Sequence, residues 1–201
     1  MKEIVVPGEL VAEEPLRSEN TYIENGKTYS KVLGLYETDK KSLIALEGIW
    51  NPRIGDVVVG IVTSARNAVY EVDLTYFGRG LLIGSKFDRQ TYKPGDMVEA
   101  EVKNVEDRGK TIILWRPRTL FGGTILEIRP TKVPRVIGKN NTMIEQISKA
   151  TKCSIVVGTN GTVWLKGGDI GLATIAIRQI EEEAHTSGLT ERIKAMLEGQ
   201  H

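Results

Sequence analysis

The chain has 201 residues, of which 27 are basic and 26 acidic, giving a formal net charge of +1 at pH 7. This balanced, 40% hydrophobic composition is typical of a folded globular protein and argues against a disordered chain. The one cysteine, Cys153, excludes an internal disulfide and a zinc site of paired thiolates, so we expect a reducing, cytoplasmic location. No apolar run approaches the roughly 20 residues that span a bilayer, and no signal-peptide core follows Met1, so we expect no membrane association.

Residues 1–52 are predicted to form a small β-rich domain. Asn25-Gly26 lies between the alternating runs 21–24 and 27–32, and both residues tolerate the positive φ of a type I′ turn, so a hairpin is expected here. About fifty residues supply little core of their own. The segment has 6 basic and 9 acidic residues, which disfavours a nucleic-acid platform, and we interpret it as a docking domain.

Residues 53–118 are predicted to form a five-stranded barrel of the OB kind, with no long helix. The expected strands are 57–62, 70–74, 80–83, 97–105 and 111–115. In the fourth strand we expect Val98, Ala100 and Val102 to face inward. Segments GDVVVGIV (55–62), YEVDL (70–74) and GLL (80–82) resemble an S1 RNA-binding domain.

Several side chains in or beside the barrel loops are candidates for RNA contact. Cations there could attract a threaded strand electrostatically, and the candidates are Arg66, Arg79, Lys86, Arg89, Arg108 and Lys110. The alternative for any one of them is an ordinary solvated loop residue. Aromatic rings could stack on bases, and the possible groups are Tyr70, Tyr76, Phe77, Phe87 and Tyr92. We expect at least two of these rings to belong to the core instead.

Residues 119–201 carry the most specific motif, VIGKNNTMIEQI at 136–147, which resembles the helix-loop-helix core of a type I KH domain. The flanking pattern agrees with that family: a strand at 124–128, a hairpin at 154–157 and 162–166, a helix at 169–184 capped by Asp169, and a helical tail. Residues 119–168 hold 7 basic and 2 acidic side chains, a positive block in a nearly neutral chain.

The KH resemblance implies that the G-x-x-G loop lets nucleotides lie across exposed backbone near a helix N-terminus. The implied RNA-binding residues are Arg135, Ile137, Gly138, Lys139, Asn140 and Asn141. Asn141 stands where the family has its last glycine; asparagine can adopt the left-handed conformation, but its side chain crowds the path of the strand. The alternative is a helix pair that only buries its isoleucines, with Gly138 as a helix stop.

Enzymatic chemistry has little support in this sequence. The two histidines, His185 and His201, lie beyond the last expected KH strand, and Glu106-Asp107 is an isolated acidic pair suited to a hairpin tip. The acidic run 181–183 is expected to be a solvated helix end. We therefore predict a chain that is not an enzyme and has no catalytic residues, metal site or cofactor.

The order of the three modules gives a more specific resemblance. An acidic N-terminal β domain followed by S1 and then KH resembles the RNA-binding cap subunits of the archaeal exosome, of the kind without a zinc ribbon, and VVPGE at 5–9 is similar to the turn that opens that family. Overall we expect a multidomain, mainly β plus α+β protein. Polynucleotide phosphorylase has KH before S1 and does not fit.

The exosome resemblance implies single-stranded RNA as ligand. It also implies three copies on a ring of RNase PH-like subunits, held by the N-terminal domains, with the S1 domains lining the entry pore. Two alternatives remain open from the residues. One is a free-standing S1/KH RNA-binding regulator, and the other is a protein-interaction adapter without RNA affinity.

Overall fold

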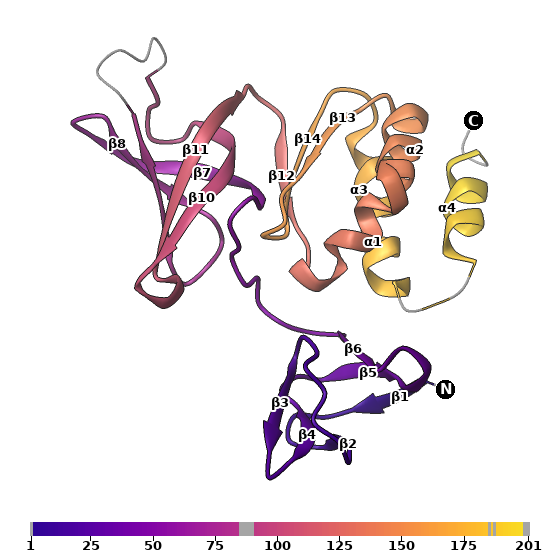
Figure 1. Cartoon of the computed structure of the whole chain (residues 1–201). Helices are drawn as coiled ribbons and strands as arrows, with labels where there is room; N and C mark the ends of the chain where they lie inside the picture. Colours follow the sequence, from indigo (N-terminus) through magenta and orange to yellow (C-terminus); the bar gives the residue numbers. More distant parts are fainter. Residues whose placement is uncertain (1, 85–90, 185, 187, 199–201) are drawn as a thin grey trace. The chain divides into compact units, whose positions relative to one another are not determined.

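The computed structural model describes residues 2–84, 91–184, 186 and 188–198 and divides into two compact units, Met1–Ile49 and Trp50–His201 (Figure 1). The first unit is all β, whereas the second contains a closed barrel followed by a mixed α+β module. The predicted fold class is confirmed. Among the described residues, no helix combines the length and apolar character needed to cross a bilayer.

The first unit consists of two three-stranded antiparallel sheets. One has the order β1 (Lys2–Val5), β5 (Gly34–Glu37), β6 (Ser42–Ala45), and the other β2 (Leu10–Ala12), β4 (Lys27–Ser30), β3 (Thr21–Glu24). A 3₁₀ turn, η1 (Thr38–Lys40), joins β5 to β6. Between β3 and β4, Asn25 and Gly26 have φ values of 49° and 78°, which confirms the predicted hairpin turn.

The two faces of the β1-β5-β6 sheet differ in burial. Val5, Tyr36 and Leu43 form a small buried core on one face. On the other face the register places Ile4 beside Leu35 and Leu35 beside Ile44. Ile4 is 67% exposed and Ile44 48% exposed, so an apolar row crosses this sheet in contact with solvent. We call Ile4, Leu35 and Ile44 the apolar row.

The barrel closes in the order β7-β8-β9-β11-β10, with β9 and β11 parallel. Its strands are β7 (Val57–Arg66), β8 (Val69–Asp73), β9 (Arg79–Ile83), β10 (Met97–Glu106) and β11 (Thr111–Leu120), and a 3₁₀ turn, η2 (Asp107–Gly109), links the last two. Val98, Ala100 and Val102 are at most 2% exposed in the barrel core, as predicted. Trp50 also packs into this core, and its Nε1 donates to Asp56 at 3.0 Å.

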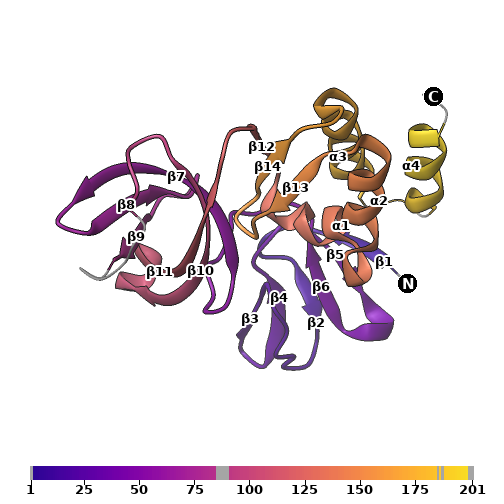
Figure 2. The same ribbon diagram turned by 90° about the horizontal axis from the view of Figure 1, so that it is seen from above.

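The C-terminal module is an antiparallel sheet with helices on one face, as the two views show (Figure 2). The sheet order is β12 (Thr124–Glu127), β14 (Thr162–Lys166), β13 (Ser154–Val157). The helical elements are η3 (Pro130–Lys132), α1 (Val133–Ile137), η4 (Lys139–Asn141), α2 (Thr142–Thr151), α3 (Ile170–Glu183) and α4 (Leu189–Glu198). The chain order of strand, two helices, two strands and a helix is that expected from the KH motif and its flanking pattern.

Sequence patterns explain the helices of this module. Asp169 caps α3, because its side chain accepts a hydrogen bond from the Leu172 N–H at 2.9 Å. Ala173, Ala176, Ile177 and Ile180 repeat at helical spacing and are fully buried. In α4, the residues Leu189, Ile193 and Leu197 join the same core, so the C-terminal helix is an integral part of this module.

The barrel and the KH sheet pack directly on each other. Val59, on the outer surface of β7, is buried in a cluster with Leu120 and Trp164. The turn between β13 and β14 also reaches β7, where Thr159 donates from its backbone N–H to the Val57 carbonyl at 2.8 Å. These contacts hold the two modules as one unit.

Candidate nucleic-acid interface

The loop between α1 and α2 reverses the chain, as the KH motif predicts. Gly138 ends α1 with φ 76° and ψ 170°. Asn140 and Asn141 have φ values of 52° and 63°, both left-handed, so asparagine does adopt here the conformation expected of it at the last glycine position. The Thr142 hydroxyl donates to the Lys139 carbonyl at 2.8 Å and stabilises the start of α2.

Gly138 is required by sterics as well as by its φ. A Cβ at this position would lie 2.7 Å from the Met143 Cβ and 2.8 Å from the Met143 backbone nitrogen. Met143 is buried in the module's core and cannot give way. The close approach of the loop to α2 therefore depends on a glycine.

The predicted cations of this loop are available to a ligand. Arg135, Lys139, Asn140 and Asn141 are exposed, while Ile137 packs partly against the core. Guanidinium and ammonium groups beside a helix N-terminus suit phosphate oxygens and carry no base preference. The loop thus presents exposed cations to solvent, with the Asn141 side chain exposed at the position where the family has a glycine.

The structure separates the predicted barrel cations into two groups. Arg79, Arg108 and Lys110 lie at one end, since the Arg79 N–H donates to the Lys110 carbonyl at 2.9 Å and Arg108 precedes it in the β10–β11 turn. Arg66 lies at the opposite end, where Val69 pairs with both Arg66 and Ile83. Four residues of strand, about 13 Å, separate the two ends of β8. Lys86 and Arg89 lie outside the described residues.

The predicted stacking rings divide between core and surface. Tyr70 and Tyr92 are buried against each other with ring centroids 5.1 Å apart, which confirms that at least two of the five rings belong to the core. Tyr76 is half-buried against Trp50, and burial raises the pKa of its hydroxyl above the usual value. Phe77 is 68% exposed beside it and can accept a base. Phe87 lies outside the described residues.

Comparison with known protein families accounts for most of the chain. The model described as exosome RNA binding protein RRP4 N-terminal domain matches residues 2–45, the S1 RNA binding domain matches 51–116, and a KH domain matches 123–171. "Exosome complex component Rrp4" of Methanosarcina mazei is 37% identical over 99% of this chain and 83% of its own length. The protein of the same name from Pyrobaculum aerophilum is 36% identical over 98% of this chain and 93% of its own length. The chain belongs to the Rrp4 family.

A solved structure agrees with membership in the Rrp4 family. It is a crystal structure provisionally described as an exosome complex RNA-binding protein, with 32% identity and a TM-score of 0.64. The match covers 76% of this chain and 97% of that one. The resemblance predicted from the order of the modules is therefore confirmed at the level of the family.

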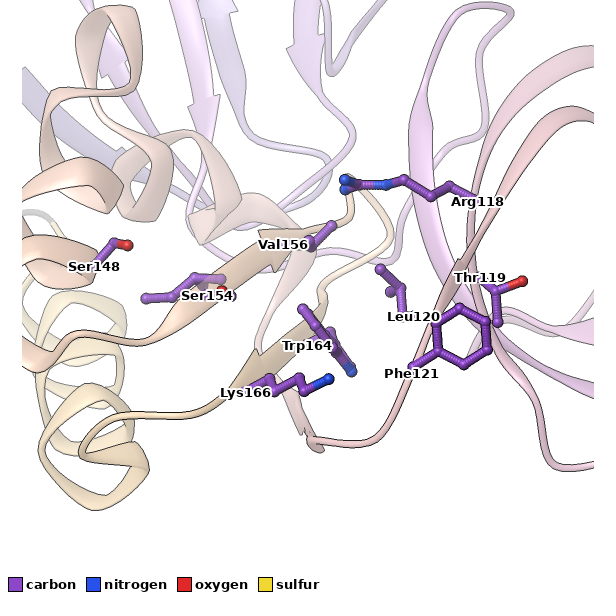
Figure 3. A pocket seen from close by; sticks show the side chains of 10 residues that line it. Arg118, Thr119, Leu120, Phe121, Ser148, Ser154, Val156, Trp164 and Lys166 are labelled. Atoms are coloured by element: carbon purple, nitrogen blue, oxygen red, sulfur yellow. The ribbon is translucent and has the colours of Figure 1, made fainter.

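Sequence reasoning missed part of the charged and aromatic surface of this Rrp4 family member. Phe121 is 71% exposed in the connector between β11 and β12, and Arg118 and Lys166 lie near it (Figure 3). The expected strand ended at residue 115, so Arg118 and Phe121 received no role, and Lys166 was predicted only as the last residue of a strand. The sequence Phe-Gly-Gly at 121–123 was a signal that could have drawn attention to the connector.

The buried carboxylate of Glu181, on α3, has a structural role. Glu181 is 6% exposed and accepts hydrogen bonds from the Arg129 backbone N–H at 2.8 Å, from Arg129 Nε at 3.1 Å and from Arg178 at 2.8 Å. Burial alone raises its pKa, but these donors outweigh burial and hold the pKa below the usual value for a glutamate. The prediction of a solvated helix end is therefore wrong for Glu181, because Arg129, which follows β12, lies against α3 and donates to this carboxylate. Across the described residues, no cluster of three potential metal ligands occurs.

Proposed function

We propose that this chain is a non-catalytic RNA-binding cap component of the exosome that captures single-stranded RNA and guides it to a ring of RNase PH-like subunits. The observation that carries the proposal is the match to Rrp4 exosome components over nearly the whole chain. The S1 and KH modules supply exposed cations and backbone for phosphates, while the ring supplies the chemistry. Three copies around one pore would raise the local RNA concentration without new contacts.

The N-terminal unit is proposed as the docking domain, with the apolar row as its contact surface. Ile4, Leu35 and Ile44 form one apolar strip on a unit whose own core is small. Exposed apolar residues gathered on one sheet face are typical of a surface that another protein covers. The excess of acidic over basic residues in this unit favours a basic rim on the partner.

Co-purification with the ring subunits tests the docking role. We expect Ile4→Glu combined with Ile44→Glu to abolish association, since it buries two charges in an apolar contact. Ile175→Glu is the matched control, because Ile175 is 57% exposed on α3 of the other unit. Full retention of the ring by the double variant would refute this assignment.

Truncation tests the division of labour between the units. Removing residues 1–49 leaves Trp50 in the barrel core, so the remaining unit keeps its packing. We expect the truncated chain to lose the ring and to keep salt-dependent affinity for single-stranded RNA. Persistent co-purification of the truncated chain would contradict the proposed docking role, and absence of RNA affinity in the full chain would favour the adapter alternative. A full chain that binds RNA as a monomer without any ring partner would favour the free-standing regulator.

A further inference from the structure

A groove of about 480 Å³ opens between the end of β11 and the KH sheet (Figure 3). On the barrel side it is lined by Arg118, Leu120 and Phe121. On the KH side it is lined by Ser154, Trp164 and Lys166, among others. It is separate from the α1–α2 loop, whose residues do not line it.

The residues of β14 that line the groove lie on the sheet face that the helices do not cover, and Ser148 of α2 lines it as well. Along β13 and β14, Val163 and Leu165 point into the helical core, so Trp164 and Lys166, which alternate with them, point to the opposite face. Ser154 pairs with Lys166 across the two strands and shares that face. Nucleotides bound here would therefore occupy a different surface from those at the α1–α2 loop.

The floor of the groove is apolar and fixed. Leu120 and Trp164 are about 5% exposed, in the same cluster as Val59. The Trp164 indole N–H donates to the Gly122 carbonyl at 2.6 Å, which satisfies the ring's polar atom and holds the connector against it. The backbone of Gly123 passes so close to β14 that a Cβ there would lie 2.4 Å from the Leu165 carbonyl oxygen.

Phe121 is an exposed ring on this rigid connector. It lies between buried Leu120 and the glycine that Trp164 holds, yet it is itself 71% exposed. In Figure 3 its ring stands at the side of the groove, opposite the strands that carry Trp164 and Lys166. An exposed aromatic face of this kind is a surface on which a planar base can stack.

The charge of the groove favours an anion. Lys166 and Arg118 line it, and no acidic side chain does so among the described residues. Arg118 is shared, because its guanidinium contacts Glu99 at 2.5 Å with 64% of its side chain still exposed. Lys166 is therefore the stronger phosphate partner of the two.

We propose that this groove binds a short segment of single-stranded RNA, with one base stacked on Phe121 and a neighbouring phosphate beside Lys166. The inference rests on the proposed RNA-binding function and adds a second contact surface to it. The groove combines an aromatic face and an apolar floor with basic side chains, and no acidic side chain lines it among the described residues. These features match a nucleotide, whose base is planar and whose backbone is anionic. The bound RNA would contact both modules here, so one RNA segment would bridge the barrel and the KH sheet.

Fluorescence anisotropy with the full chain and a fluorescein-labelled oligouridylate at low salt tests the groove. We expect Phe121→Leu to weaken binding at least about fivefold and Phe121→Tyr to retain it, because tyrosine keeps the stacking face. Lys166→Glu should weaken binding and lower the salt slope by about 1, with Lys166→Arg close to the parent chain. Lys31→Glu is the charge-matched control, at an exposed site in the first unit.

Two results separate failure of the groove from failure of the function. If the unaltered chain has no salt-dependent affinity for the oligouridylate, the proposed function itself is wrong. If it binds, but Phe121→Leu and Lys166→Glu match Lys31→Glu, the groove is overturned while the function stands. If an acidic peptide binds in a Lys166-dependent way while Lys166→Glu leaves the RNA affinity unchanged, the groove is also overturned.

Photocrosslinking of the unaltered chain gives an answer that does not depend on any variant. With 4-thiouridine in the oligouridylate, we expect mass spectrometry to find crosslinks on the peptide that contains Phe121. Crosslinks confined to the barrel loops and to residues 138–141 overturn the proposal.

Discussion

The side-chain amide of Asn160 pairs with both backbone groups of Val59. Its Oδ1 accepts from the Val59 N–H at 3.2 Å, and its Nδ2 donates to the Val59 carbonyl at 2.8 Å. The strand β8 pairs with β7 only from Ile61 onward, so Val59 lies beyond the end of that partner strand. Asn160 takes the place of the missing strand, which satisfies backbone groups that packing against the KH sheet buries.

Asn160→Ala is expected to destabilise the second unit by roughly 1 to 3 kcal/mol, because it leaves the Val59 and Leu74 carbonyls buried without this donor. Denaturant unfolding measures the change. Asn104→Ala, at an exposed asparagine of β10, is the control and should cost less than about 0.5 kcal/mol. Hydrogen exchange supplies a local readout: the Val59 amide should exchange faster in Asn160→Ala, and unchanged protection would contradict the role given to Asn160.

Glu181 makes stability depend on pH in a defined direction. Burial opposes its charge, but donors from Arg129 and Arg178 lower its pKa in the folded state below the usual value for a glutamate. A carboxyl whose folded pKa is depressed contributes stability above its unfolded pKa and loses that contribution as the pH falls through the folded value. At pH 7 the full contribution is present.

Glu181→Gln is therefore expected to cost roughly 1 to 3 kcal/mol at pH 7, with a difference from the parent chain that shrinks as the pH falls below about 4.5. Urea unfolding at several pH values measures this. Glu182→Gln is the matched control, because Glu182 is the exposed neighbour on the same helix. A cost that stays constant from pH 7 to pH 3 would rule out the ionised carboxylate as its source.

The α1–α2 loop offers a gain-of-binding test. Asn141 already has φ 63°, so Asn141→Gly should fold like the parent chain while removing the side chain that stands where the family has a glycine. We expect a severalfold rise in affinity for single-stranded RNA in anisotropy titrations, if the KH loop takes part in binding. Asn140→Gly is the control, since it removes the same side chain from a neighbouring left-handed position. Equal affinities for both variants would indicate that the Asn141 side chain does not limit binding.

Gly138→Ala, in the same loop, is expected to destabilise the fold. The added Cβ would lie 2.7 Å from the Met143 side chain at a φ of 76°, so we expect a loss of roughly 1 to 3 kcal/mol in unfolding free energy. Thermal unfolding measures it. Stability equal to that of the parent chain would show that the loop can move away from α2.

Local signals were sufficient wherever one turn or one periodic face decides the structure. Asn25-Gly26 fixes a hairpin and Asp169 caps α3 within a few residues of sequence. The extent of β11 was missed, because a left-handed Arg116 followed by Pro117 breaks the alternation that marks a strand. Its continuation is held by a distant partner strand, since Arg118 pairs with Glu99 of β10.

The site was less predictable than the fold, because it depends on residues far apart in the sequence. Asn160 lies in the turn of the predicted hairpin between 154–157 and 162–166, yet its partner Val59 lies 101 positions earlier. Phe121 and Lys166 come together only because β12 and β13 flank β14 and the connector crosses Trp164. Composition could indicate the positive block at residues 119–168, but not which of its cations share a face.

The two ends of the barrel can be compared directly, because Arg66 and Arg108 lie at opposite ends and both are exposed. If RNA runs along the whole barrel, Arg66→Glu and Arg108→Glu should each weaken binding to a similar degree for oligouridylate and oligoadenylate, since phosphate contacts carry no base preference. Each should also lower the slope of log affinity against log salt by about 1. Lys31→Glu is the control for net charge. An effect confined to Arg108→Glu would place the strand at the end formed by Arg79 and Lys110, whereas unchanged affinity of both variants at low salt would remove the barrel loops from the interface.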